Sequence, residues 1–218
     1  MYIYLKYIKS TQGYFPFVCP YCPRNPKTSN RPIIWTFWHD YNLPKPVKLA
    51  IDSWKHYNPE YDICIITKYN IDQYIRTDEL PPTFDKQIIQ RKADIIRIIL
   101  LYKYGGVWAD STFFMCKPLK LFPPEKPYDI SGYYIEKFTT NPKYTIFENW
   151  FFVAQKNNLL IKLWKDELFK CLSFEDDNAY VESVLNDGVD LQGIPKKLQA
   201  YLSIHVAFQV VLPRCQTV

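Results

Sequence analysis

Short runs of β-branched and aromatic residues alternate along the chain with longer segments in which apolar residues recur every three or four positions. The short runs predict buried strands at Ile33–Trp38, Tyr61–Thr67, Val107–Ala109, Ile130–Ile135 and Trp150–Ala154. Strands that alternate with helices are typical of a mostly parallel central sheet flanked by helices. The pattern therefore predicts an α/β fold.

The longer segments predict helices. Pro44 and Pro46 open the first helix, because proline is tolerated in a first helical turn, and Asn58-Pro59 ends it. Asn70 follows the second strand, and we expect it to cap a short helix through Tyr74. Further segments with helical spacing are Leu159–Cys171, Ala179–Leu185 and Leu198–Val210, the last of which could instead hold a strand.

The longest helical segment is expected to begin near Phe84. Its central part, residues 93–101, contains only two polar side chains, Asp94 and Arg97. A helix that is apolar all round is a buried helix. An unpaired charge on it would lower the stability of the fold, because a buried charge loses its hydration. Residues three apart share one helix face, so these two side chains either form a structural ion pair or serve one ligand together.

Gly105 and Gly106 end this helix, because glycine accepts the left-handed backbone found at helix ends. The strand that follows ends on Asp110, and Ser111 and Thr112 come next. Ligand-binding groups of open α/β sheets lie at the carboxyl ends of buried strands. Asp110 alone could be a turn residue. However, it follows the two glycines that end the helix carrying Asp94 and Arg97, and this position favours one site shared by all three side chains.

Composition narrows the classes of protein. A chain of 218 residues is expected to form one core, and a net charge of +5 fits either a nucleoside diphosphate or contact with an anionic membrane surface. The lysines are scattered rather than grouped in runs, so we expect no nucleic-acid partner.

No stretch near 20 residues is free of charge, and Met1–Ile8 is too short for a signal peptide. We therefore expect a cytoplasmic protein without a transmembrane segment.

The six cysteines do not indicate a disulfide framework in a chain of this length. Cys19 and Cys22 have the Cys-x-x-Cys spacing of a redox site. Redox use needs a helix that begins at this pair and lowers the thiol pKa, whereas Pro23 and Pro26 follow here. A second Cys-x-x-Cys for zinc is absent from the sequence. We therefore expect neither redox nor metal chemistry at this pair.

The segment ADIIRIILLYKYGGVWADST resembles the sugar-nucleotide-binding motif of the family 32 glycosyltransferases, and most closely that of the capsular polysaccharide synthesis branch. The shared pattern is Asp-x-x-Arg, then Leu-Tyr-x-x-Gly-Gly, then Asp-x-Asp or Asp-x-Thr. Similarity also covers the first strand, the SWKHYNPEYDICIIT stretch, the segment Asn149–Ala154 and the SIHVAF stretch. The resemblance runs from about residue 32 to 210, so residues 1–31 are expected to be an irregular extension and 32–218 one domain.

The resemblance implies a GT-A (Rossmann-like) fold that transfers a sugar from a nucleotide donor, such as a UDP- or GDP-sugar, to a hydroxyl of a glycan or polysaccharide. It implies catalytic roles for Asp94, Arg97 and Asp110, which would contact the donor. It also implies that Trp38, which closes the first strand, stacks on the base, although Trp38 could equally be a core residue. The donor-binding set is completed by Phe37, Gly106 and Thr112.

One residue departs from the family pattern. Thr112 occupies the position of the second carboxylate of Asp-x-Asp, and a hydroxyl is a much weaker ligand for a hard divalent cation. Either Asp110, the diphosphate and a later residue hold Mn²⁺ or Mg²⁺, or lysine and arginine neutralise the charge instead. The departure also leaves open a second hypothesis, a sugar-nucleotide or glycan-binding module of the same fold without efficient turnover.

The sequence does not identify the group that receives the proton of the acceptor hydroxyl. Candidates for acceptor binding or for the base are Asn149, Asp129, Glu148 and His205, each of which could instead have a structural role. Retention and inversion at the anomeric carbon both stay open.

Overall fold

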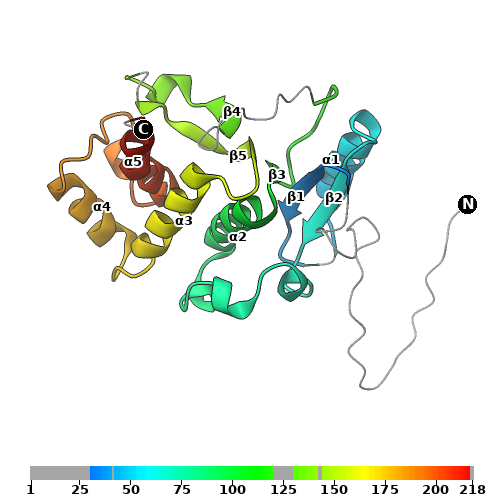
Figure 1. The fold of residues 1–218 in the computed structure, drawn as a ribbon, viewed down its shortest axis with the longest axis horizontal. Helices are drawn as coiled ribbons and strands as arrows, with labels where there is room; N and C mark the ends of the chain where they lie inside the picture. The colour runs from blue at the N-terminus through cyan, green and yellow to red at the C-terminus, as the bar shows by residue number, and fades with distance from the viewer. Residues whose placement is uncertain (1–29, 41, 120–129, 142–143, 217–218) are drawn as a thin grey trace, which may run out of the picture.

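The computed structural model describes residues 30–40, 42–119, 130–141 and 144–216 (Figure 1). Within these ranges five strands form one sheet in the order β2-β1-β3-β5-β4. The strands are β1 (Ile33–Phe37), β2 (Asp62–Ile66), β3 (Gly106–Ala109), β4 (Ile130–Tyr134) and β5 (Phe147–Ala154). The α-helices are α1 (Lys45–Tyr57), α2 (Ile89–Tyr104), α3 (Leu159–Cys171), α4 (Asp177–Asn186) and α5 (Ser203–Gln216). The chain is therefore a mixed α/β protein, as the pattern predicted.

The sheet has a parallel and an antiparallel part. β1 pairs in parallel with β2 on one side and with β3 on the other. β5 then inserts between β3 and β4 and pairs antiparallel with both, with Trp108 opposite Phe152. The predicted parallel direction therefore holds for β1, β2, β3 and β4, and among the described strands only β5 runs the opposite way. β5 also begins three residues before the predicted Trp150.

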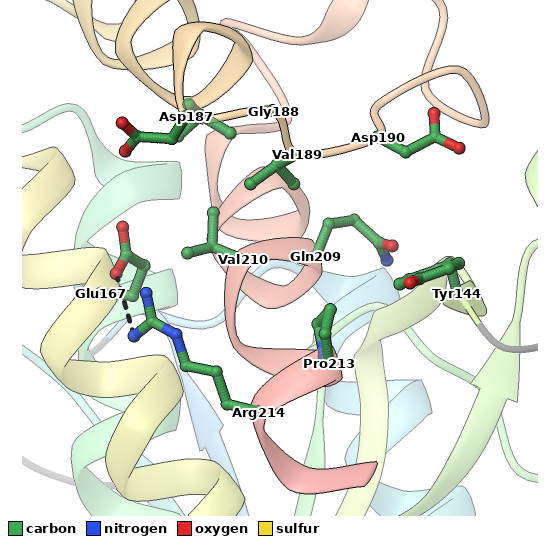
Figure 2. Close-up of a pocket in the computed structure, with 11 residues that line it drawn as sticks. Tyr144, Glu167, Asp187, Gly188, Val189, Asp190, Gln209, Val210, Pro213 and Arg214 are labelled. Carbon is green, nitrogen blue, oxygen red and sulfur yellow. Dashed lines mark ion pairs between the residues drawn. The ribbon is translucent and has the colours of Figure 1, made fainter. Parts of the chain in front are cut away.

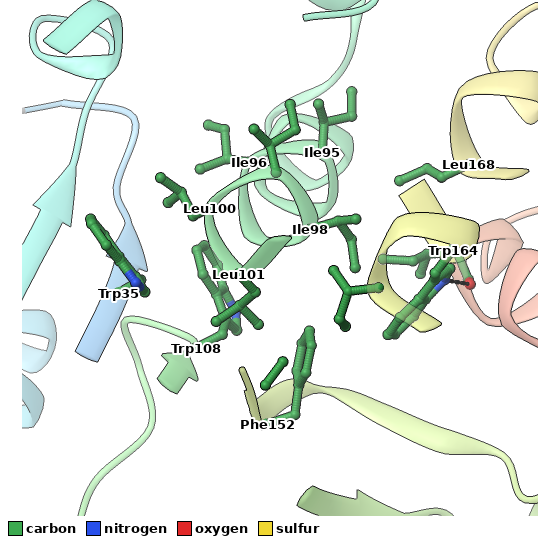
Figure 3. Close-up of a cluster of buried hydrophobic side chains, with 14 of the residues drawn as sticks. Trp35, Ile95, Ile96, Ile98, Leu100, Leu101, Trp108, Phe152, Trp164 and Leu168 are labelled. Atoms are coloured by element: carbon green, nitrogen blue, oxygen red, sulfur yellow. Dashed lines mark hydrogen bonds between the residues drawn. The ribbon is translucent and has the colours of Figure 1, made fainter. Parts of the chain in front are cut away.

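Alternate residues of the strands face two different layers of helices. Ile34, Val107 and Val153 point toward α1, where they pack with its Trp54. The other side of the sheet faces α2, α3 and α5. Figure 3 shows α2 lying between Trp35 of β1 and Trp164 of α3, with Trp108 and Phe152 beneath it. α2 is therefore packed on several sides, which explains its apolar sequence.

The start of α2 differs from the prediction. Phe84–Lys86 forms a separate 3-10 turn, η3, and the α-helix begins only at Ile89. Gln87 and Ile88 lie between them with extended ψ angles of 147° and 158°. This extended link breaks the helical path that apolar spacing alone suggested. At the other end the predicted stop is confirmed, because Gly105 caps α2 with a φ of 70°.

Two further expectations need correction. Asn70 precedes a 3-10 turn, Ile71–Gln73, but its side chain does not cap it. Instead the amide turns back, accepting a hydrogen bond from the Thr67 backbone N–H and donating one to the carbonyl of Ile65. The last helix is α5, which begins at Ser203 rather than at Leu198 and excludes the alternative of a strand there. The Gln199 side chain donates to the Leu191 and Ile194 carbonyls. These hydrogen bonds tie Gln199 to the loop before it, which is separate from α5.

Within the described residues, no helix combines the length and the apolar character needed to cross a bilayer. Cys19, Cys22 and Asp129 lie outside the described residues.

Candidate functional site

A cavity of about 940 Å³ lies at the carboxyl ends of β1 and β3. Parts of the chain that are far apart in sequence form its walls: the end of β1, the first half of α2, β3 and the segment after it, one residue each from β5 and α4, and the start of α5 with the chain that leads into it. The lining residues include Phe37, Trp38, Ile88, Ile89, Arg91, Asp94, Arg97, Trp108, Asp110, Ser111, Thr112, Asn149, Asp177, Tyr201, Leu202 and His205.

Arg97 is the central charged group of this cavity. Its Nη2 atom lies 3.3 Å from Oδ1 of Asp94 and 3.3 Å from Oδ1 of Asp110. Its Nη1 atom donates to the backbone carbonyl of Asn149, and its guanidinium carbon lies 5.0 Å from the centroid of the Trp108 ring. The side chain is only 5% exposed. Several independent contacts therefore hold one buried cation between two carboxylates.

Asp94 is largely buried, with 14% of its side chain exposed. Burial raises the pKa of this carboxyl, while the positive charges of Arg97 and Arg91 act in the opposite direction. The Asn149 side-chain amide also donates to Oδ1 of Asp94 at 3.2 Å. Asn149 thus contacts both members of the pair, one through its side chain and the other through its carbonyl.

Asp110 is oriented by its own strand. The indole N–H of Trp108 donates to Oδ1 of Asp110 at 2.8 Å, and the Asp110 backbone N–H donates to the Trp150 carbonyl. The carboxylate is 39% exposed, so it is fixed at one oxygen and open to the cavity. Thr112, two residues on, is exposed and lines the same cavity.

Phe37 and Trp38 lie at the end of β1 and also line the cavity. Trp38 is half-buried: it packs against the apolar layer under α1, and its backbone N–H donates to the Ile66 carbonyl. Trp38 therefore has a core contact and also a place in the cavity wall.

Two predicted site residues do not line the cavity. Gly106 has a φ of 102°, and a side chain there would come within 2.6 Å of the Ile33 carbonyl oxygen. Glycine is thus required at this position for the close approach of β1 and β3. Glu148 lies on β5 away from the cavity, and partial burial raises its pKa.

His205, by contrast, is in the cavity wall and 5% exposed. Neither ring nitrogen has a hydrogen-bond partner among the described residues. Burial, with a smaller contribution from the charge of Arg97, lowers the pKa of His205 to about 4. The ring is therefore neutral near pH 7, with one nitrogen that can donate and one that can accept.

Sequence reasoning missed Arg91 and Asp177. Arg91 lies six residues before Arg97 on α2. Its Nη2 donates to Oδ2 of Asp177 at 2.8 Å, and its Nη1 lies 4.0 Å from Oδ2 of Asp94. Arg91 lies two positions before the motif recognised in the sequence, on the same helix as Asp94, and this proximity could have identified it. Asp177 had no such signal, because it lies 86 residues further along the chain.

The acidic groups of the cavity bear on whether it can hold a metal ion. Among the described residues, no three His, Cys, Asp or Glu side chains are placed to hold one. Mg²⁺ in nucleotide sites is commonly bound through one or two carboxylates together with substrate phosphates. Asp110 fits such a site, because one of its oxygens accepts from Trp108 and the carboxylate still reaches the cavity.

A second, smaller cavity of about 370 Å³ lies between α3, α5 and the loop after α4 (Figure 2). Glu167 and Arg214 form an ion pair in its wall, with 3.9 Å between the charged atoms. None of the predicted site residues lines this cavity. The larger cavity is therefore the candidate site.

Comparison with known proteins shows which proteins the chain is similar to. The chain is 29% identical to the O-glycosyltransferase braB of Annulohypoxylon truncatum over 169 residues, which are 68% of this chain and 39% of that protein. It is 26% identical to the glycosyltransferase afumC of Aspergillus fumigatus over 159 residues, 64% of this chain and 40% of that protein. The chain thus spans about two fifths of the length of these curated relatives.

Among solved structures, the PaToxG glycosyltransferase superposes with a TM-score of 0.49 at 19% identity, covering 84% of this chain and 78% of the other.

The family comparison corrects one expectation. Residues 3–180 match the family model described as capsular polysaccharide synthesis protein. The match begins inside the segment 1–31, which we had expected the resemblance not to cover. The match ends before His205. It includes the whole stretch from Asp94 to Thr112, and at this extent the chain belongs to the capsular polysaccharide synthesis protein family.

Proposed function

We propose that this protein is a glycosyltransferase, which moves a sugar from a nucleoside diphosphate donor to a hydroxyl of an acceptor. The observation that carries the proposal is the buried Arg97 held between Asp94 and Asp110 in the wall of the large cavity. An ion pair with only a structural role does not need a cavity beside it, so the position of this cluster in a cavity wall supports a role in ligand binding. The names of the two curated relatives support the same class of reaction.

The donor would occupy the part of the cavity that lies between β1 and the segment after β3. In this arrangement Trp38 stacks on the base, with Phe37 beside it, and Asp94 and Arg97 contact the ribose and the sugar. The rigidity of Arg97 supports such a role, because a group that is already fixed loses little entropy when the donor binds.

Asp110 would face the diphosphate, and we propose that it holds Mn²⁺ or Mg²⁺ together with the phosphate oxygens. The metal would supply positive charge to the leaving diphosphate as the bond from the anomeric carbon breaks. Ser111 and Thr112 offer hydroxyl groups next to that position.

The acceptor hydroxyl must bond to the anomeric carbon and release its proton. Asn149 and His205 line the cavity, and we propose that they position this hydroxyl. The third candidate, Asp129, lies outside the described residues. The acceptor class implied by the family is a glycan or polysaccharide.

The test uses the purified full chain and a panel of UDP- and GDP-sugars, with Mn²⁺ and with EDTA. A donor present at about 100 times its dissociation constant adds roughly 2.7 kcal/mol to the free energy of unfolding, which a thermal shift will detect. Release of the nucleoside diphosphate measures turnover. If no sugar nucleotide stabilises the protein and none is hydrolysed, the proposal is wrong.

The second candidate is a module of the same fold that binds a sugar nucleotide without efficient turnover. Thr112, in place of a second carboxylate, favours it. The same experiment separates the two, because a binding module would show the thermal shift without release of nucleotide.

A further inference from the structure

The large cavity has a chemically different second end. Ile89 and Arg97 are eight residues apart on α2, which corresponds to about 12 Å along the helix. Ile88, 63% exposed, and Ile89 lie at the start of this helix, beyond the ion pair of Arg91 with Asp177, and Tyr201, 67% exposed, and Leu202 line the same cavity. The cavity wall therefore turns from charged to apolar toward the start of α2.

These side chains are unusual for the described surface of this protein. Few large hydrophobic residues are exposed to this extent, and three of them, Ile88, Ile89 and Tyr201, meet at one cavity. Exposed apolar groups that gather at a concave site mark a place where a ligand removes them from water.

His205 links the two ends. It lies four residues after Tyr201 and lines the same cavity as Arg97, whose charge contributes to the lowered pKa of His205. Both of its buried nitrogens are without a partner among the described residues. Burying a polar group without a hydrogen bond is costly, and a hydroxyl ligand would supply the missing partner.

We propose that the end of the cavity formed by Ile88, Ile89, Tyr201 and Leu202 is the acceptor subsite, and that it takes an alcohol with an apolar body. The hydroxyl would point past His205 toward the charged end, and the apolar body would cover the exposed side chains. This inference rests on the proposed glycosyl transfer and goes beyond it, because a wholly polar glycan would leave these side chains without an apolar partner.

The test compares two probes that share one sugar and differ only in the tail: octyl β-D-glucopyranoside, below its micelle concentration, and methyl β-D-glucopyranoside. Binding of each to the full chain is measured by calorimetry in the presence of UDP. We expect the octyl compound to bind at least ten-fold more tightly, a preference that requires the burial of only about two methylene groups. Ile88→Ser combined with Tyr201→Ser should remove most of that preference.

Leu49→Ser combined with Leu185→Ser is the matched control, because it also replaces two exposed apolar side chains, both outside the cavity. Equal affinity for the two probes, or an equal loss in the control, would overturn the proposal. Self-association that disappears in the Ile88/Tyr201 variant would assign the surface to a second copy of the chain and would also overturn it. Because binding is measured without turnover, absence of donor hydrolysis would count against the proposed function alone.

Discussion

Asp94 and Asp110 share one cation: Nη2 of Arg97 lies 3.3 Å from Oδ1 of each carboxylate. Asp94 comes from a buried helix and Asp110 from the end of the next strand, so the shared cation fixes the distance between helix and strand. The two carboxylates differ in environment, since Asp94 is largely buried whereas Asp110 opens to the cavity. This difference suits one carboxylate for holding Arg97 and the other for meeting a ligand.

Replacement of Asp110 tests the ligand role. Asp110→Asn keeps an oxygen that can accept from Trp108 but removes the charge that would face a metal and the diphosphate. We expect donor hydrolysis to fall by about 100-fold or more, on the scale of losing one electrostatic stabiliser, while the melting temperature changes little. Asp85→Asn, at an exposed position outside the cavity, is the control. Activity within a few fold of the parent would make Asp110 structural.

Trp38 should bind the base of the donor. Trp38→Ala is expected to weaken donor binding by about 1–3 kcal/mol, the range known for stacking of bases on aromatic side chains. The donor should also quench tryptophan fluorescence in the parent. Because Trp38 packs against the core as well, affinity must be measured below the melting temperature of the variant. Unchanged affinity in the folded variant would assign Trp38 to the core alone.

The pair of Asp94 and Arg97 should show unequal effects. Arg97→Met leaves Asp94 buried, with its nearest remaining cation, Arg91, at 4.0 Å, and should cost about 3–5 kcal/mol of stability. Asp94→Leu should cost less, because Arg97 keeps Asp110 and the Asn149 carbonyl. The double variant should recover part of the loss and still fail to bind donor.

A double-mutant cycle scored by melting and by donor affinity measures these terms separately. If the double variant folds and binds the donor as tightly as the parent, the pair is only a structural ion pair.

His205 should make stability depend on pH. Its pKa is lowered from 6.5 to about 4, so the unfolded chain takes up a proton that the folded protein excludes. Its contribution to stability is present above pH 6.5 and is lost as pH falls toward 4, amounting to roughly 3 kcal/mol. His205→Leu should flatten the curve of unfolding free energy between these values. The same slope in both proteins would contradict the assignment.

Thr112 should limit metal affinity. Thr112→Asp restores the second carboxylate of the motif, and we expect the Mn²⁺ concentration for half-maximal hydrolysis to fall by about ten-fold, because carboxylates are preferred ligands of hard cations. Thr112→Ser keeps the hydroxyl and should behave like the parent. If EDTA leaves hydrolysis intact and Thr112→Asp changes nothing, arginine and lysine rather than a metal neutralise the diphosphate.

Local sequence determined the centre of the site. Asp94 and Arg97 are one helical turn apart, so the periodicity of an apolar helix placed them together and predicted their burial. Gly105 ends that helix because its backbone is left-handed, and the next strand then delivers Asp110 to the carboxyl edge of the sheet. All of these relations join residues close in sequence, where backbone geometry fixes the distance.

The tertiary structure alone decided the rest of the cavity. Arg91 meets Asp177 across 86 positions, and Arg97 meets the Asn149 carbonyl across 52. His205 reaches the cavity through α5, and β5 enters the sheet antiparallel between β3 and β4. Such contacts depend on how whole elements pack, and hydrophobic periodicity shows which face of an element is buried but not which partner covers it.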